Sequence, residues 1–73
     1  MLVDRNAILK LEKYLRSTFR LDTIVVRQRP QKDDSAEVYI GDEFVGILFR
    51  DDEDDELSYS FQMAILDYDL ENH

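Results

Sequence analysis

The sequence of 73 residues contains no cysteine and no tryptophan, and only one histidine, one proline and two glycines. Without cysteine, the chain cannot form disulfides, iron–sulfur clusters or thiolate zinc sites. Its uninterrupted apolar runs reach only four residues, as in Met63–Leu66, so we expect no membrane span, no secretory signal segment and a cytoplasmic location. With no thiol, and no base placed to activate its serines, we expect neither enzymatic activity nor a cofactor.

The charges that are present are unevenly distributed along the chain. Residues 1–32 carry eight basic and three acidic side chains, a net charge of +5, whereas residues 33–73 carry fourteen acidic side chains and only Arg50, a net charge of −13. Such a polarised chain can orient one subunit against another or attract a charged partner to one half. Alternatively, the two halves fold against each other and neutralise locally.

A hydrophobic period of 3.6 residues predicts a helix over about residues 4–20. Asp4 is a suitable N-cap, and Val3 and Ile8 have the spacing of a hydrophobic staple across it. Glu12 and Arg16 form an i,i+4 pair in the favourable orientation. The stripe expected to face the core consists of Ile8, Leu11, Leu15 and Phe19.

After Asp22 the hydrophobic period changes to 2, which predicts strands over about residues 23–29, 35–41, 43–50 and 57–65. The pair Gly41–Asp42 suits a two-residue type II′ hairpin turn. For residues 62–70, a strand end, a short helix and a segment lying over the sheet all remain open. The predicted fold class is α+β, a single domain over residues 1–73 with an N-terminal helix packed on a four-stranded antiparallel β-meander.

The hairpin turn also predicts which strand residues face the helix. It pairs Ile40 with Glu43, and we therefore expect Val38 opposite Val45 and Ala36 opposite Ile47. These predicted registers align the apolar residues of one sheet face into a surface that the helix stripe can cover. The expected core face comprises Ile24, Val26, Ala36, Val38, Ile40, Val45, Ile47 and Phe49, with the alternating apolar residues of 57–65.

The opposite face of the sheet, called the outer face below, carries an unusual apolar row. The same registers place Val25, Tyr39 and Phe44 side by side with Leu48 nearby, and Arg27 across from Glu37. An apolar centre with a polar rim is typical of a protein interface. Either the C-terminal residues Leu66, Tyr68 and Leu70 cover this row, or a second subunit or another protein does. The predicted interaction face is Val25, Arg27, Arg29, Tyr39, Phe44 and Leu48.

A basic stripe on the predicted helix gives the alternative hypothesis, a nucleic-acid-binding accessory protein. The stripe consists of Arg5, Lys13, Arg16 and Arg20. A helix followed by three strands is also how a double-stranded-RNA-binding domain begins, but that fold closes with a helix whose start is basic. Here the corresponding segment is the acidic run 51–56, which would repel phosphates, and nucleic-acid-binding domains are normally basic overall. We therefore expect a protein partner or a homo-oligomer rather than nucleic acid.

The acidic run 51–56 (DDEDDE) also suggests a cation site, because Ca²⁺ and Mg²⁺ bind carboxylate oxygens. It lacks the glycine and the ligand spacing of an EF-hand loop, and adjacent residues on a short loop cannot all point at one ion. We expect no functional metal site, and at most a weak association of divalent cations. A third hypothesis is a structural monomer that binds small ligands or metal weakly or not at all.

The segment RPQKDDSAEVYIGDEFVGILFRDDEDDELSYSFQMAILDYDL, preceded by the helix KLEKYLRSTF, resembles a small bacterial family catalogued as domain of unknown function 3126. The stretches DDSAEVYIGDEF and SYSFQMAILD carry this resemblance most specifically. The resemblance implies a stand-alone bacterial domain with the segment boundaries given above, and it assigns no activity, ligand or catalytic residue. From the residues, we expect a non-catalytic protein-interaction module that self-associates or docks a protein partner through the outer face.

Overall fold

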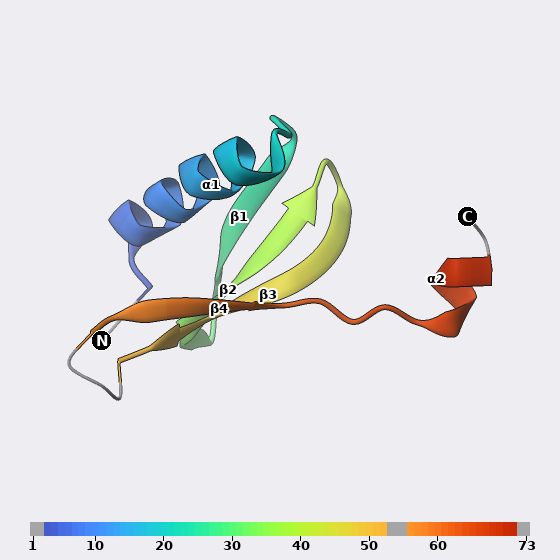
Figure 1. Ribbon diagram of the computed structural model, residues 1–73. Helices are drawn as coiled ribbons and strands as arrows, with labels where there is room; N and C mark the ends of the chain where they lie inside the picture. Colours follow the sequence, from blue (N-terminus) through green and yellow to red (C-terminus); the bar gives the residue numbers. More distant parts are fainter. Residues whose placement is uncertain (1–2, 53–55, 72–73) are drawn as a thin grey trace.

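The computed structural model describes residues 3–52 and 56–71. Its elements are α1 (Arg5–Phe19), β1 (Ile24–Arg29), β2 (Lys32–Ile40), β3 (Glu43–Asp51), β4 (Ser58–Gln62) and α2 (Asp67–Glu71). The four strands form one antiparallel sheet in the order β1-β2-β3-β4, and α1 lies against one of its faces (Figure 1). This arrangement confirms the predicted α+β fold class.

Helix α1 begins at its predicted N-cap and ends at a left-handed C-cap residue. The Asp4 carboxylate accepts a hydrogen bond from the backbone N–H of Ala7 at 2.9 Å, which satisfies one of the free amides of the first turn. At the other end Arg20 adopts the left-handed conformation, with φ of 55° and ψ of 48°, and its N–H returns to the Arg16 carbonyl. Val3 is buried in the same cluster as Ile8, as the staple spacing predicts.

The hydrophobic core lies between α1 and the first three strands. Ile8 and Leu15 are its buried helix residues and Leu11 packs beside them, so this part of the predicted stripe is confirmed. Phe19 is 56% exposed and meets the edge of the Phe61 ring at 6.5 Å between centroids, so its predicted burial is wrong. The buried core consists of Val3, Ile8, Leu15, Ile24, Val26, Ala36, Val38 and Leu48.

The turn between β2 and β3 has the predicted form. Ile40 pairs with Glu43 across Gly41–Asp42, and of these two turn residues only Gly41 has a positive φ, of 61°. A type II′ turn requires that conformation at its first central position.

Immediately after this turn, a β-bulge changes the register of β3. Val38 pairs with Gly46, because Val45 is an extra residue that has no partner of its own on β2. Ala36 consequently lies opposite Leu48. The predicted pairs Val38–Val45 and Ala36–Ile47 are therefore wrong.

The bulge exchanges the two faces of β3 over the rest of the strand, since side chains alternate with a period of 2. Leu48 is 4% exposed and belongs to the core, which corrects its predicted place on the outer face. Ile47 and Phe49 are half-buried and lie on the outer face, which corrects their predicted place in the core.

The chain after β4 leaves the sheet. Strand β4 ends at Gln62, three residues before its predicted end at residue 65, and the short helix α2 follows an irregular segment. Every residue of 63–71, called the C-terminal arm below, is exposed. Leu66, Tyr68 and Leu70 are 60%, 71% and 63% exposed, so the predicted alternative in which they cover the outer face is wrong. In Figure 1, α2 stands well apart from α1 and the sheet.

Candidate functional site

The outer face is a grid of side chains whose rows follow the pairing between strands. Val25 pairs with Tyr39 and Tyr39 with Phe44, which places the predicted apolar row across β1, β2 and β3. In the next row, Arg27 lies opposite Glu37, as predicted from the sequence. The structure therefore places three of the other five predicted face residues, Val25, Arg27 and Phe44, around Tyr39.

Tyr39 is held by contacts on three sides. The guanidinium carbon of Arg27 lies 4.4 Å from the centroid of its ring, in cation–π geometry. The Phe44 ring meets it edge-on, with centroids 5.6 Å apart and planes at 73°. Its hydroxyl donates a hydrogen bond to the Glu37 carboxylate at 3.0 Å. That hydrogen bond favours the neutral phenol and raises the pKa of Tyr39 above its ordinary value.

Two apolar residues that the sequence interpretation assigned to the core lie on the outer face instead. Ile47 lies opposite Glu37, and Phe49 lies opposite Ser35, so both extend the apolar row along β3. Arg29 closes the third row at the β1 side, where its Nη1 donates to the Ser35 hydroxyl at 3.1 Å. The sequence does not reveal that Ile47 and Phe49 face outward. The residues around the bulge are apolar on both faces of the strand, so the hydrophobic pattern looks the same with and without it.

Within the described part of the chain, no element lies over the outer face. Helix α1 packs on the opposite face, and the C-terminal arm is exposed throughout. Phe44 is 50% exposed, and Val25, Tyr39, Ile47 and Phe49 are half-buried. The face therefore combines an aromatic and aliphatic centre with charged neighbours, which is the composition of an interaction surface.

The family comparison agrees with the resemblance seen in the sequence. The model of the family described as "Protein of unknown function (DUF3126)" matches residues 7–69. The chain belongs to this family. The matched residues include all four strands and nearly all of α1, so the DUF3126 match covers almost the whole fold described above. No curated protein and no solved structure matches the chain.

The basic stripe of this DUF3126 chain does not act as four independent surface charges. Arg5, Lys13 and Arg20 are exposed, and Arg20 also forms the C-cap of α1. Arg16 is half-buried, and its Nε donates a hydrogen bond to the Ile24 carbonyl at 2.8 Å. One of the four predicted phosphate-binding groups is therefore already engaged inside the DUF3126 fold.

The partner of Arg16 on α1 has a second role that the sequence did not reveal. Glu12 and Arg16 form the expected ion pair at 3.1 Å. The second carboxylate oxygen of Glu12 also accepts a hydrogen bond from the Val26 N–H at 3.0 Å, next to the Ile24 carbonyl bound by Arg16. These two helix side chains therefore hydrogen-bond to one carbonyl and one N–H on the edge of β1 that faces away from β2. An i,i+4 spacing alone could not show this, because the contact depends on where α1 sits.

The acidic run 51–56 includes residues 53–55, which lie outside the described residues. The Arg50 Nε and the Asp52 carboxylate lie 3.8 Å apart at the edge of this run. Among the residues that the structure describes, no group of three or more His, Asp or Glu side chains is arranged to hold a metal ion. In the same described residues, no helix is long and apolar enough to cross a membrane.

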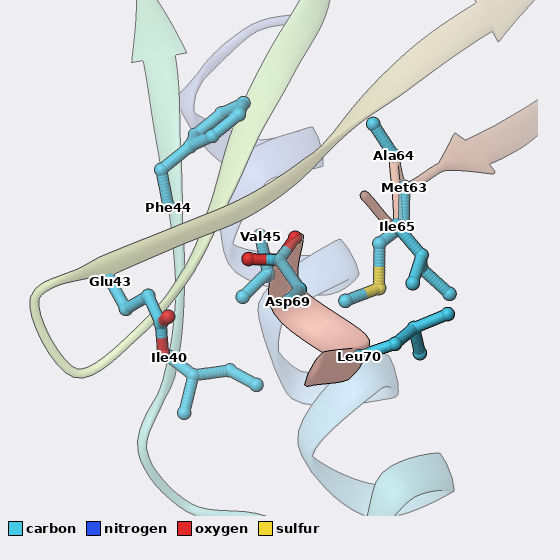
Figure 2. Close-up of a pocket in the computed structure, with 9 residues that line it drawn as sticks. All are labelled: Ile40, Glu43, Phe44, Val45, Met63, Ala64, Ile65, Asp69 and Leu70. Atoms are coloured by element: carbon cyan, nitrogen blue, oxygen red, sulfur yellow. The ribbon is translucent and has the colours of Figure 1, made fainter. Parts of the chain in front are cut away.

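A hollow of about 430 Å³ lies between the β2–β3 hairpin and the C-terminal arm. Figure 2 shows Ile40, Phe44 and Val45 on the hairpin side, and Met63 with Leu70 on the arm side. Glu43 and Asp69 are its titratable lining groups, and its other lining side chains are apolar. Because Phe44 lines both this hollow and the outer face, the two apolar surfaces are continuous.

Proposed function

We propose that this protein is a non-catalytic interaction module that docks a protein partner, or a second copy, through its outer face. The observation that carries the proposal is the apolar row Val25–Tyr39–Phe44, which no described element covers. Exposed apolar patches of this kind mark interaction sites on soluble domains. The proposal includes the cytoplasmic, bacterial setting expected from the sequence.

The arrangement of Tyr39 supports its role as an anchor. The ring is already oriented by Arg27, Phe44 and Glu37, so a partner that packs on it need not order it first. Rigid aromatic side chains cost little conformational entropy on binding, which is why they carry much of the energy of an interface. Arg27 and Glu37 then supply charges of both signs beside the apolar centre, which favours a partner with complementary charges.

The alternative hypothesis of nucleic-acid binding receives less support. Arg16 already donates to the Ile24 carbonyl and pairs with Glu12, so a phosphate would compete with these contacts for it. The net charge of −8 opposes approach of a polyanion, and phosphate contacts dominate the affinity of nucleic-acid-binding proteins.

The test compares two glutamate variants at positions of similar exposure. Phe44→Glu places a charge in the centre of the outer face, whereas Leu9→Glu places one on α1, away from that face; the wild-type side chains are 50% and 56% exposed. We expect Phe44→Glu to lose capture of the partner from a native lysate, or self-association, with its circular dichroism unchanged. We expect Leu9→Glu to behave as wild type. Equal capture by both variants would overturn the proposal, and so would a loss of several kcal/mol of stability in Phe44→Glu alone, since that would mean the face is covered within one chain.

A further inference from the structure

The two edges of the sheet differ in a way that bears on assembly. At β1, Glu12 and Arg16 occupy the N–H of Val26 and the carbonyl of Ile24. At the other end of the sheet order, β4 pairs with β3, and four of its five residues are exposed. Strand β4 contains no charged residue, proline or glycine, which are the residues that usually prevent edge-to-edge pairing. The β4 edge is therefore suited to accept another strand.

The sequence of β4, SYSFQ, is complementary to itself in antiparallel orientation. Pairing about Ser60 would place Ser58 opposite Gln62 of a second copy, and Tyr59 opposite Phe61 of that copy. Polar side chains would then meet polar ones on the outer face, and aromatic side chains would meet on the helix side, where Tyr59 and Phe61 already lie. No like charges would oppose each other along this strand.

The C-terminal arm continues from β4 and carries apolar side chains that are largely exposed. The large apolar residues of the arm are 52–71% exposed: Met63, Ile65, Leu66, Tyr68 and Leu70. In the antiparallel arrangement, the arm that leaves Gln62 of one copy runs past Ser58 and Leu57 of the other. The arm is thus directed along the start of the second copy's β4.

A groove between α1 and the sheet lies at that start. This helix–sheet groove, of about 640 Å³, has apolar walls from Leu11, Tyr14, Leu57 and Tyr59, and Lys10 on its rim. Arg50 also lines it, together with Asp4 and Asn6. The arm carries the carboxylates of Asp67, Asp69 and Glu71 and no basic residue. The apolar arm residues therefore match the apolar walls, and the carboxylates of α2 can meet Lys10, with Asp4 as the one acidic residue among the described lining residues.

We infer that the protein forms a two-fold dimer in which two β4 edges pair about Ser60 and each C-terminal arm enters the helix–sheet groove of the other copy. The self-complementary edge explains why the partner is a second copy, since an isologous interface uses the same residues on both sides. Strand β4 ends at Gln62, and in this dimer the exposed apolar residues of the arm that follows find contacts in the groove of the other copy. This dimer uses surfaces other than the outer face, so it goes beyond the proposed function and does not depend on it.

The register can be tested with charges placed on the two-fold axis. Ser60→Lys brings two lysines directly opposite each other, and Ser60→Glu brings two glutamates, so each variant alone should weaken the dimer at least about tenfold. An equimolar mixture of the two variants should restore association to the wild-type level or above it. Ser58→Lys is the matched control for an added edge charge: it faces Gln62 of the second copy and creates no like-charge pair, so it should weaken the dimer less than Ser60→Lys does. Sedimentation equilibrium of the full chain at several concentrations gives each dissociation constant.

The arm is tested by Ile65→Ser and Leu70→Ser, whose wild-type side chains are 62% and 63% exposed. Neither change should lower the stability of the monomer, but both should weaken the dimer at least about tenfold. A wild type that is monomeric at millimolar concentration would overturn the inference. It would also be overturned if the Ser60 variants and their mixture all dimerise as the wild type does. A dimer lost in Phe44→Glu but intact in Ser60→Lys would assign self-association to the outer face instead, so failure of this inference and failure of the proposed function give different results.

Discussion

Leu48→Ala tests the β-bulge on which the composition of the outer face depends. In the unbulged register, Leu48 points outward and Ile47 belongs to the core. In the structure, Leu48 is 4% exposed and sits against the core face, and Ile47 is half-buried on the outer face. Truncation of each residue to alanine in turn therefore distinguishes the two registers by which variant loses stability.

The expected magnitudes are well separated. Removing a buried leucine side chain beyond Cβ costs about 2–5 kcal/mol, because the lost transfer free energy adds to that of the cavity left behind. For Ile47→Ala we expect about 1 kcal/mol or less, because part of that side chain already contacts water. A core of this size supplies only about 3–5 kcal/mol of net stability, so Leu48→Ala should be largely unfolded at 25 °C.

Urea denaturation followed by circular dichroism measures both free energies of unfolding. Leu48→Val, a smaller truncation, keeps the comparison usable if the alanine variant fails to fold, and we expect it to cost roughly 1 kcal/mol. Equal losses in Leu48→Ala and Ile47→Ala, or a larger loss at Ile47, would refute the bulged register and with it the residues assigned to the outer face.

Two further predictions concern β4 and the centre of the outer face. A Cβ on Gly46 would lie 2.5 Å from the Gln62 carbonyl oxygen and 2.6 Å from the Phe61 ring. Gly46→Ala should therefore lower the free energy of unfolding, measured by thermal melting, by about 1–3 kcal/mol, and a loss below about 0.3 kcal/mol would contradict this contact. Glu37→Gln should lower the pKa of Tyr39, measured from its ring signals by NMR, because the hydrogen bond to the Glu37 carboxylate raises that pKa. Since the folded-state pKa exceeds the unfolded one, the wild type should lose stability relative to Glu37→Gln as the pH rises beyond about 10, and parallel stability curves would be the contrary result.

The sequence predicts the elements of this fold well where each carries its own local signal. Asp4 marks the start of α1 because a carboxylate satisfies free amides, and Gly41 marks the hairpin because its turn requires a positive φ. In the first two strands, the alternation that turns Ile24, Val26, Ala36 and Val38 to the core places Val25 beside Tyr39 and Arg27 opposite Glu37. The apolar row at the centre of the outer face was predictable for the same reason.

The register of β3 was not predictable, and the physical cause lies in its composition. Residues 44–49 are apolar on both faces of the strand. A shift of the register by one residue therefore exchanges one apolar set for another, with little change in the free energy of burial. Gly46 decides between them: with no side chain, it lets the Phe61 ring and the Gln62 carbonyl approach the backbone. That contact is between distant residues, so it leaves no local trace. The same holds for Glu12 and Arg16, whose hydrogen bonds to β1 depend on the seating of α1.

The contact of Glu12 and Arg16 with β1 has a consequence for how far assembly can proceed. A sheet with two available edges adds copies at both ends and grows into a fibre, as in cross-β aggregates. Here Glu12 and Arg16 occupy the Val26 N–H and the Ile24 carbonyl at the β1 edge, so for the proposed dimer we expect strand addition at the β4 edge alone. An uncharged, aromatic edge strand such as β4 is then compatible with a finite particle, because the helix that covers the core also opposes strand addition at β1.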